Sequence, residues 1–287
     1  MGAFSFGESF GCLKKASPHF FVNAVLDGIH VAGSVAQLER YGIWTLARYI
    51  LPKSAFQTIE DMKSYTSALV QKRLERGPRK GQADIFNFLL REQDEADGLT
   101  YNEIMSNALT LVMAGSDSFV TTMVYCVYLL CKNPDQLRRV QTEVRTAFVG
   151  SKDINGRNVN DLEYMLAVLA ESMRLFPPGP TGLPRRITNE EGQLVAGHYV
   201  PYNVRKIRPR RRLISQADYL QTSCAVYQLA ANRCESNFTQ PKTFLPERWL
   251  DSRSPKFAND MRNAVQPFSV GPRSCIGKSS VTNENRD

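Results

Sequence analysis

The residue of this sequence best placed for chemistry is Cys275, which lies within the run FSVGPRSCIG at residues 268–277. A thiolate is the form of cysteine that ligates metals. Gly271 permits a backbone turn that a side chain would forbid, so that turn amides can point at the sulfur and stabilise its negative charge. Such a turn would favour the thiolate form of Cys275, which makes the residue a candidate metal ligand. The alternative is a buried structural cysteine in a glycine-rich loop.

A second candidate group is a pair of oppositely charged residues on one predicted helix. Glu171 and Arg174 stand three positions apart, which places carboxylate and guanidinium on the same helix face. Pairs of this kind are common on surface helices and contribute little there. Here the helix is otherwise apolar, and Arg248 follows downstream in the run FLPERW at residues 244–249. The two motifs resemble those of the cytochrome P-450 family, and the resemblance implies that the three residues form a buried ion network with a structural role.

A third group lies in the middle of a long apolar segment, where residues 114–118 read AGSDS. Ala114 and Gly115 are small enough to let a flat group approach a helix. Asp117 and Ser118 supply an acid and a hydroxyl that can relay protons. The alternative is a polar kink in a buried helix.

These three groups together resemble the motifs of the cytochrome P-450 family, and the resemblance covers residues 4–277 with one interruption. It is closest to fungal monooxygenases of secondary metabolism. It implies that Cys275 is the axial ligand of a haem iron, that Arg273 pairs with a haem propionate, and that Asp117 and Ser118 are catalytic. Ser118 stands where the family usually has threonine, so we expect poorer coupling of oxygen to product. The other residues implied to contact haem are Phe268, Gly271, Gly277, Arg185, Ala114 and Gly115.

The resemblance implies a haem-dependent monooxygenase that inserts one oxygen atom from O2 into an apolar small molecule. Its cofactor would be haem b, and its electrons would come from NADPH through cytochrome P-450 reductase. The resemblance implies association with the endoplasmic reticulum membrane through an N-terminal anchor, which we expect this chain to lack. The rival hypothesis is a catalytically inactive, truncated remnant that does not retain haem. The substrate and the site of oxidation are not specified by the sequence.

The elements that must position these groups are mostly helical. Apolar spacing predicts an amphipathic helix over residues 56–77, and a long apolar helix runs from Tyr101 to Cys131. Its length would span a bilayer, but Asp117 and the weakly charged flanks favour a helix buried in a soluble core. Asn133 is expected to cap a helix that ends near Phe148. Another helix should run from Asn160–Asp161 to Pro177, followed by short strands, which gives a mainly α fold with a small β component.

Composition excludes several other classes of protein. The 43% hydrophobic and 22% charged content is that of a globular chain. The six cysteines include no Cys-x-x-Cys pair, which argues against a structural zinc site. The net charge is +8, and five of those positive charges lie between residues 204 and 220. A nucleic-acid patch at 205–212 is the alternative to a solvated insertion, but binding aromatics are missing there, so we expect no nucleic acid partner.

Three features depart from the family pattern. We expect residues 1–287 to form a single incomplete domain, which starts after the family's first helices. Residues 204–220 separate two runs that family members join almost directly, so they are expected to be an insertion foreign to the fold, such as a retained intron. Asn232 replaces a usual histidine, and residues 278–287 are polar where an apolar helix is expected.

Overall fold

A computed structural model describes isolated positions between 10 and 49, residues 52–76, Phe86, and residues 98–202 and 223–278. The chain divides into two compact units, Met1–Val120 and Thr121–Asp287, and α7 crosses their boundary. The predicted insertion at 204–220 falls outside the described residues. The helices and strands are α2 (Cys12–Lys15), α5 (Lys53–Arg76), α7 (Tyr101–Lys132), α8 (Pro134–Ala147), η3 (Asn158–Asp161), α9 (Glu163–Leu175), β1 (Arg185–Arg186), β2 (Gln193–Val195), β3 (His198–Val200), β4 (Ser223–Cys224), α10 (Gln228–Asn232), η4 (Pro246–Trp249), η5 (Pro255–Phe257), η6 (Arg262–Ala264) and η7 (Gly271–Arg273).

The first unit is organised around α5 and the first half of α7. Apolar side chains from α5, including Met62 and Val70, form a buried core with Ile104 and Val112 of α7. The start of α7 is fixed by a capping box. Glu103 N–H donates to Thr100 Oγ1 (3.3 Å), and Thr100 N–H donates back to the Glu103 carboxylate (2.8 Å). The Thr100 hydroxyl also donates to the Glu103 carboxylate (2.7 Å), and this bond, followed by the one from the Thr100 N–H, lowers the pKa of Glu103.

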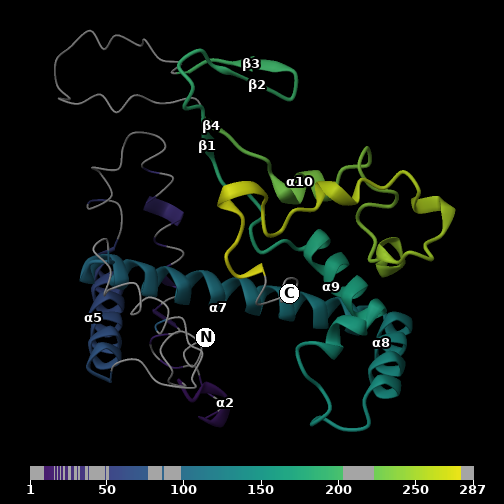
Figure 1. Cartoon of the computed structure of the whole chain (residues 1–287), viewed down its shortest axis with the longest axis horizontal. Helices are drawn as coiled ribbons and strands as arrows, with labels where there is room; N and C mark the ends of the chain where they lie inside the picture. Colours follow the sequence, from purple (N-terminus) through teal and green to yellow (C-terminus); the bar gives the residue numbers. More distant parts are fainter. Residues whose placement is uncertain are drawn as a thin grey trace. The chain divides into compact units, whose positions relative to one another are not determined.

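The second unit packs α8, α9 and the end of α7 around a separate core (Figure 1). Cys126 and Leu129 of α7 meet Val168 and Leu175 of α9, and Phe244 closes the cluster from the segment before η4. Burial raises the pKa of the Cys126 thiol. The predicted helices over 56–77, 101–131 and 133–148 are thus confirmed to within a few residues.

The positions of the helix ends are confirmed to within a few residues, but two details differ from the expectation. Asn133 stands at the N-cap position of α8, but its side chain donates to the carbonyl of Leu129 (2.7 Å), near the end of α7. The amide NH2 of Asn133 is therefore used to satisfy one of the last carbonyls of α7, which have no partner within that helix. The fourth helix begins at Glu163 rather than at Asn160–Asp161, which form η3.

The prediction that α7 is buried in a core holds for one side of the helix only. The other side carries exposed apolar residues, namely Phe119, Val120, Met123, Val124, Val127 and Tyr128. Within its most apolar window only 11% of the residues are buried. Among the described residues, α7 is the one helix whose length and composition would suit a membrane span. The hydropathy of the sequence did not show whether other residues pack against one side of α7 or against its whole circumference.

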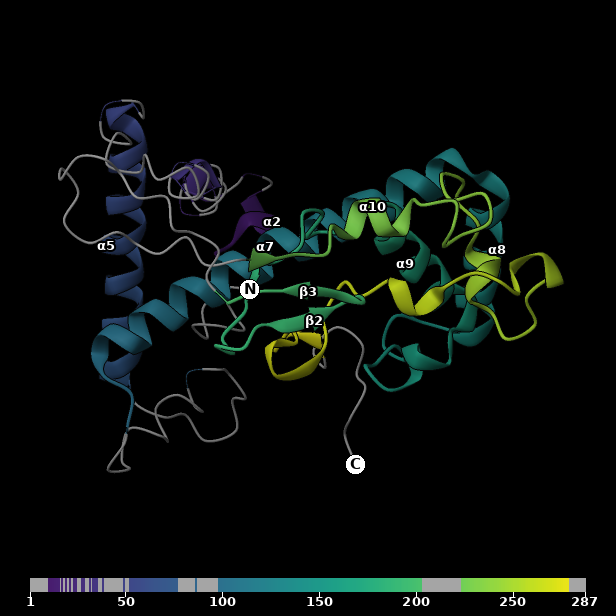
Figure 2. The ribbon, with the colours of Figure 1, turned by 90° about the horizontal axis from the view of Figure 1, so that it is seen from above.

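The β component consists of two two-stranded antiparallel ribbons among the described residues. Strands β2 and β3 form a hairpin in which Val195 pairs with His198 (Figure 2). The two turn residues, Ala196 (φ 49°) and Gly197 (φ 80°), both adopt positive φ, as a tight hairpin of this kind requires. In the other ribbon, β1 pairs with β4. The prediction of a mainly α fold with a small β component is confirmed.

Candidate functional site

The loop that carries Cys275 is a turn closed by its own backbone. The N–H of Cys275 donates to the carbonyl of Phe268 (2.7 Å), and the N–H of Ser274 donates to that of Gly271 (2.9 Å). Gly271 has φ +76° with open space around it, so the glycine is required by its conformation rather than by crowding. Ser269 also adopts positive φ (58°). Two residues with positive φ therefore shape the turn before the cysteine.

The surface around Cys275 is open and partly apolar. Its thiol is free and exposed, so the alternative of a buried structural cysteine is not what the structure shows. A Cβ added at Gly277 would lie 3.6 Å from the Cys275 Sγ, so the glycine leaves that side of the sulfur clear. Ile276 is 85% exposed. Arg273 is also exposed, and among the described residues its guanidinium has no ion-pair partner.

The turn amides do not point at the sulfur as expected. The N–H groups of Ser274 and Cys275 are used in the backbone bonds that close the turn, and the N–H of Lys278 donates to the carbonyl of Cys275 (3.2 Å). The helix expected after Cys275 lies beyond the described residues. Among the residues that the structure describes, no hydrogen bond to the Cys275 sulfur is found, so the shape of the turn presents the thiol.

The predicted ion network is present and fully buried. Arg174 donates two hydrogen bonds of 2.8 Å to the carboxylate of Glu171, one from Nε and one from Nη2. Arg248 Nε donates to the same carboxylate at 3.1 Å. All three side chains have no exposed surface. Helix α9 supplies the first two residues and η4 supplies the third, so the network joins two segments that are far apart in the sequence.

The network contains members that the sequence motifs did not identify. Asp260 forms an ion pair with Arg248 Nη1, and its side chain is 1% exposed. The indole N–H of Trp249 donates to Glu171 (2.9 Å), and so does the backbone N–H of Leu245 (3.0 Å). Counting the buried charges would have predicted one more acidic residue, because two buried guanidinium groups require a second anion. Nothing in its spacing identified which acid that would be.

Asn232 and Arg233 hold the end of α9. Asn232 Nδ2 donates to the carbonyl of Arg174 (3.1 Å), and Arg233 Nε donates to that of Leu175 (3.1 Å). In return, Arg174 Nη1 donates to the backbone carbonyl of Asn232 (2.7 Å). The side-chain oxygen of Asn232 is buried without a partner among the described residues. The asparagine thus fills the site of the usual histidine at the cost of one unpaired acceptor.

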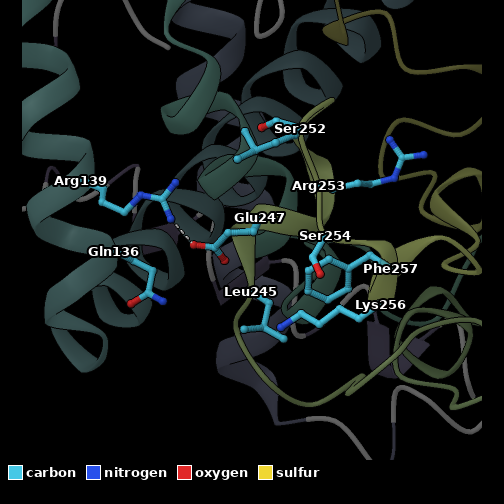
Figure 3. Close-up of a pocket in the computed structure, with 10 residues that line it drawn as sticks. Gln136, Arg139, Leu245, Glu247, Ser252, Arg253, Ser254, Lys256 and Phe257 are labelled. Carbon is cyan, nitrogen blue, oxygen red and sulfur yellow. Dashed lines mark hydrogen bonds and ion pairs between the residues drawn. The ribbon is translucent and has the colours of Figure 1, made fainter.

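A second polar cluster joins α8 to α9 and η4. Arg139 forms an ion pair with Glu247 across a groove of about 420 Å³ (Figure 3). The hydroxyl of Tyr164 donates to the same carboxylate (3.0 Å), and the Arg139 guanidinium lies 3.9 Å from the centre of the tyrosine ring. Burial, and after it the charge of Glu247, raises the pKa of Tyr164 above its usual range. Arg139 and Glu247 are therefore paired with each other, while Arg253 and Lys256 also line the groove.

Glu143 caps α9 from the neighbouring helix. Its carboxylate accepts hydrogen bonds from the backbone N–H groups of Tyr164 (2.7 Å) and Met165 (2.8 Å). These are first-turn donors that an N-cap side chain would normally satisfy, and the residue at that position, Leu162, cannot do so. Sequence reasoning missed Glu143, because no local motif links residues 143 and 164.

The remaining predicted residues lie apart from the cysteine loop in the sequence and on other elements. Asp117 and Ser118 are half-buried on α7 in the first unit, and Ser118 Oγ donates to the carbonyl of Ala114. Ala114 is exposed and Gly115 is half-buried. Arg185 is exposed on β1 and donates to the adjacent carbonyl of Pro184 (3.3 Å). The hydroxyl bond of Ser118 is a typical local bond of a serine within a helix.

Comparison with known proteins identifies the family. The family model of cytochrome P450 matches residues 1–205 and 220–279. The chain belongs to this family. The stretch that separates the two matched ranges falls within the predicted insertion at 204–220. That assignment and the single-domain assignment remain predictions, because no comparison tests them.

Relatives and solved structures agree with the family assignment. The chain is 34% identical to averantin hydroxylase of Dothistroma septosporum over its whole length, which covers 50% of that protein. It is 33% identical to trichothecene C-4 hydroxylase of Trichoderma arundinaceum, of which it covers 55%. The haem domain of cytochrome P450DA superposes with a TM-score of 0.72 at 20% identity, over 99% of this chain and 56% of that one. The fold is therefore a partial P450 fold, and the chain spans about half the length of the curated relatives that it matches.

Proposed function

We propose that this chain carries the haem-ligating part of a fungal P450 monooxygenase, which inserts one oxygen atom from O2 into an apolar small molecule of secondary metabolism. The observation that carries the proposal is the exposed, free thiol of Cys275, presented on a glycine turn in a chain of the P450 family. Its similarity to fungal hydroxylases supports the reaction class.

The residues around Cys275 fit an iron porphyrin. A thiolate is a suitable soft ligand for the iron, and the clear side at Gly277 and the exposed Ile276 offer contact for a flat apolar ring. The unpaired guanidinium of Arg273 can bind a propionate, and we assign the same role to Arg185. Phe268 and Gly271 would shape the turn. When bound, haem b would supply the activation of O2, which protein side chains alone do not provide.

Helix α7 would supply the groups that handle protons. Ala114 and Gly115 leave space for a flat ring, while Asp117 can hold and release a proton at its carboxylate. Ser118 offers a hydroxyl whose present hydrogen bond is to the Ala114 carbonyl. Because serine lacks the methyl group that restricts the threonine rotamer, we expect it to hold that hydroxyl less firmly.

The electron supply and location follow the family. We propose NADPH as the source of electrons through cytochrome P450 reductase, and the endoplasmic reticulum membrane as the site of the complete protein. These assignments rest on family membership alone.

The test is the absorption spectrum of the purified chain supplemented with haem, reduced and exposed to carbon monoxide. We expect a strongly red-shifted Soret band that Cys275→Ala abolishes. Cys234→Ala is the matched control, because Cys234 is also an exposed, free cysteine but lies outside the loop. Failure to take up haem, or a band that survives Cys275→Ala, would support the inactive remnant instead.

A further inference from the structure

Asp260 completes the charge balance of the buried network. Glu171, Arg174 and Arg248 alone would place two cations and one anion in a region without exposed side-chain surface. Asp260 contributes the second anion through its ion pair with Arg248. Since an unpaired buried charge is strongly unfavourable, the network depends on this carboxylate.

The same carboxylate also fixes the backbone at the start of the segment that leads to Cys275. Asp260 Oδ1 accepts a hydrogen bond from the backbone N–H of Thr239 (2.7 Å), while Oδ2 faces Arg248. The next residue, Met261, donates its N–H to the carbonyl of Asn237 (2.7 Å). These bonds join residues 260–261 to 237–239, so the segment begins from a fixed point.

Between that point and the cysteine turn, few bonds hold the chain to the rest of the unit. Arg262 Nη1 donates to the carbonyl of Trp249 (3.3 Å), and the N–H of Gln266 donates to the side chain of Gln228 on α10 (3.1 Å). The turn that carries Cys275 then closes on itself. Among the described residues after Asp260 none is buried, so this carboxylate is the last buried anchor of the chain before the turn that carries Cys275.

We propose that Asp260 is a positioning residue for the Cys275 loop, coupling the buried ion network to the place where the thiolate is presented. This inference rests on the proposed haem-thiolate function. Because Asp260→Asn leaves one guanidinium of the buried network without its anion and loosens the start of this segment, we expect it to lower haem affinity severalfold. The fraction of the red-shifted carbon monoxide band should fall with it.

Three variants separate positioning from charge balance. Asp260→Asn removes the charge at nearly constant shape. Asp260→Glu keeps the charge but adds a methylene, so the backbone at 260 must move relative to Arg248. Positioning predicts a reduced red-shifted band for both variants, whereas a role in charge balance alone predicts a normal spectrum for Asp260→Glu. Asp251→Asn is the matched control, because Asp251 is an exposed aspartate that should leave the spectrum unchanged.

Hydrogen exchange of the haem-free chain provides a second readout that does not depend on the proposed function. We expect the amides of residues 261–275 to exchange faster in both Asp260 variants than in wild type, with the core of α9 less affected. If the wild-type chain takes up no haem, the proposed function fails and the exchange data still decide the role of Asp260. Uniform acceleration across the whole unit, or a normal spectrum and normal exchange in Asp260→Glu, would overturn the positioning role.

Discussion

Replacement of Glu143 by alanine should destabilise the second unit by removing the cap of α9. The carboxylate satisfies two first-turn N–H groups, and no side chain at the N-cap position can replace it. Loss of an N-cap costs about 0.5–2 kcal/mol. Loss of a negative charge near the positive end of the helix adds about 0.3–1 kcal/mol. We therefore expect Glu143→Ala to lower the free energy of unfolding by about 2 kcal/mol.

The assay is urea and thermal denaturation followed by circular dichroism. For a unit of this size, a loss of about 2 kcal/mol corresponds to a melting temperature lower by roughly 4–8 °C. Glu143→Gln keeps an acceptor oxygen but loses the charge, so its melting temperature should fall between those of alanine and wild type. Glu163→Gln is the matched control, since Glu163 lies exposed in the same first turn. Equal losses for Glu163→Gln and Glu143→Ala would show that a general charge effect, rather than the two hydrogen bonds, is responsible.

Further predictions concern the turns, the buried tyrosine and an exposed thiol. Gly271→Ala should cost about 1–2 kcal/mol of stability from its positive φ alone, whereas Gly182→Ala should cost more in denaturation experiments, because its Cβ would lie 1.8 Å from a backbone carbonyl; equal costs would contradict this. Because the pKa of Tyr164 is raised in the folded state, folding favours the neutral phenol. The resulting contribution to the free energy of unfolding is complete below the unfolded pKa of about 10 and is lost as the pH rises above it. The urea midpoint should fall with pH in that range for wild type and less for Tyr164→Phe. A hydrogen bond from Ser236 lowers the pKa of Cys234, so Ser236→Ala should slow its alkylation by iodoacetamide at neutral pH, as measured by mass spectrometry; an unchanged rate would refute the assigned cause.

The sequence predicted those features that are encoded by neighbouring residues. The helix over 56–77 and the long helix from Tyr101 follow from apolar spacing, and Glu171 and Arg174 meet because residues three apart share a helix face. The pairing with Arg248 was available only from the resemblance to a family.

The features that the sequence did not predict depend on contacts between distant residues. Glu143 bonds to residues 21 and 22 positions later, and Asp260 meets Arg248 only after the chain has folded around η5. Asn133 has the right residue type for a cap, but the end of α7 competes for its side chain. The type of a residue indicates which groups its side chain could bind, and tertiary packing determines which of them it does bind.

The hydrogen bonds at the end of α9 close a long loop, and the effect of that loop on stability depends only weakly on its length. Asn232 and Arg233 reach carbonyls 58 positions earlier in the chain, and β1 pairs with β4 within that interval. The entropy of closing a loop grows only with the logarithm of its length, so that doubling a loop costs about 0.6 kcal/mol. The stretch at 204–220 lengthens either interval by less than a doubling. Evolution can therefore add or remove residues between these anchors at almost no thermodynamic cost, provided that the anchors themselves are retained.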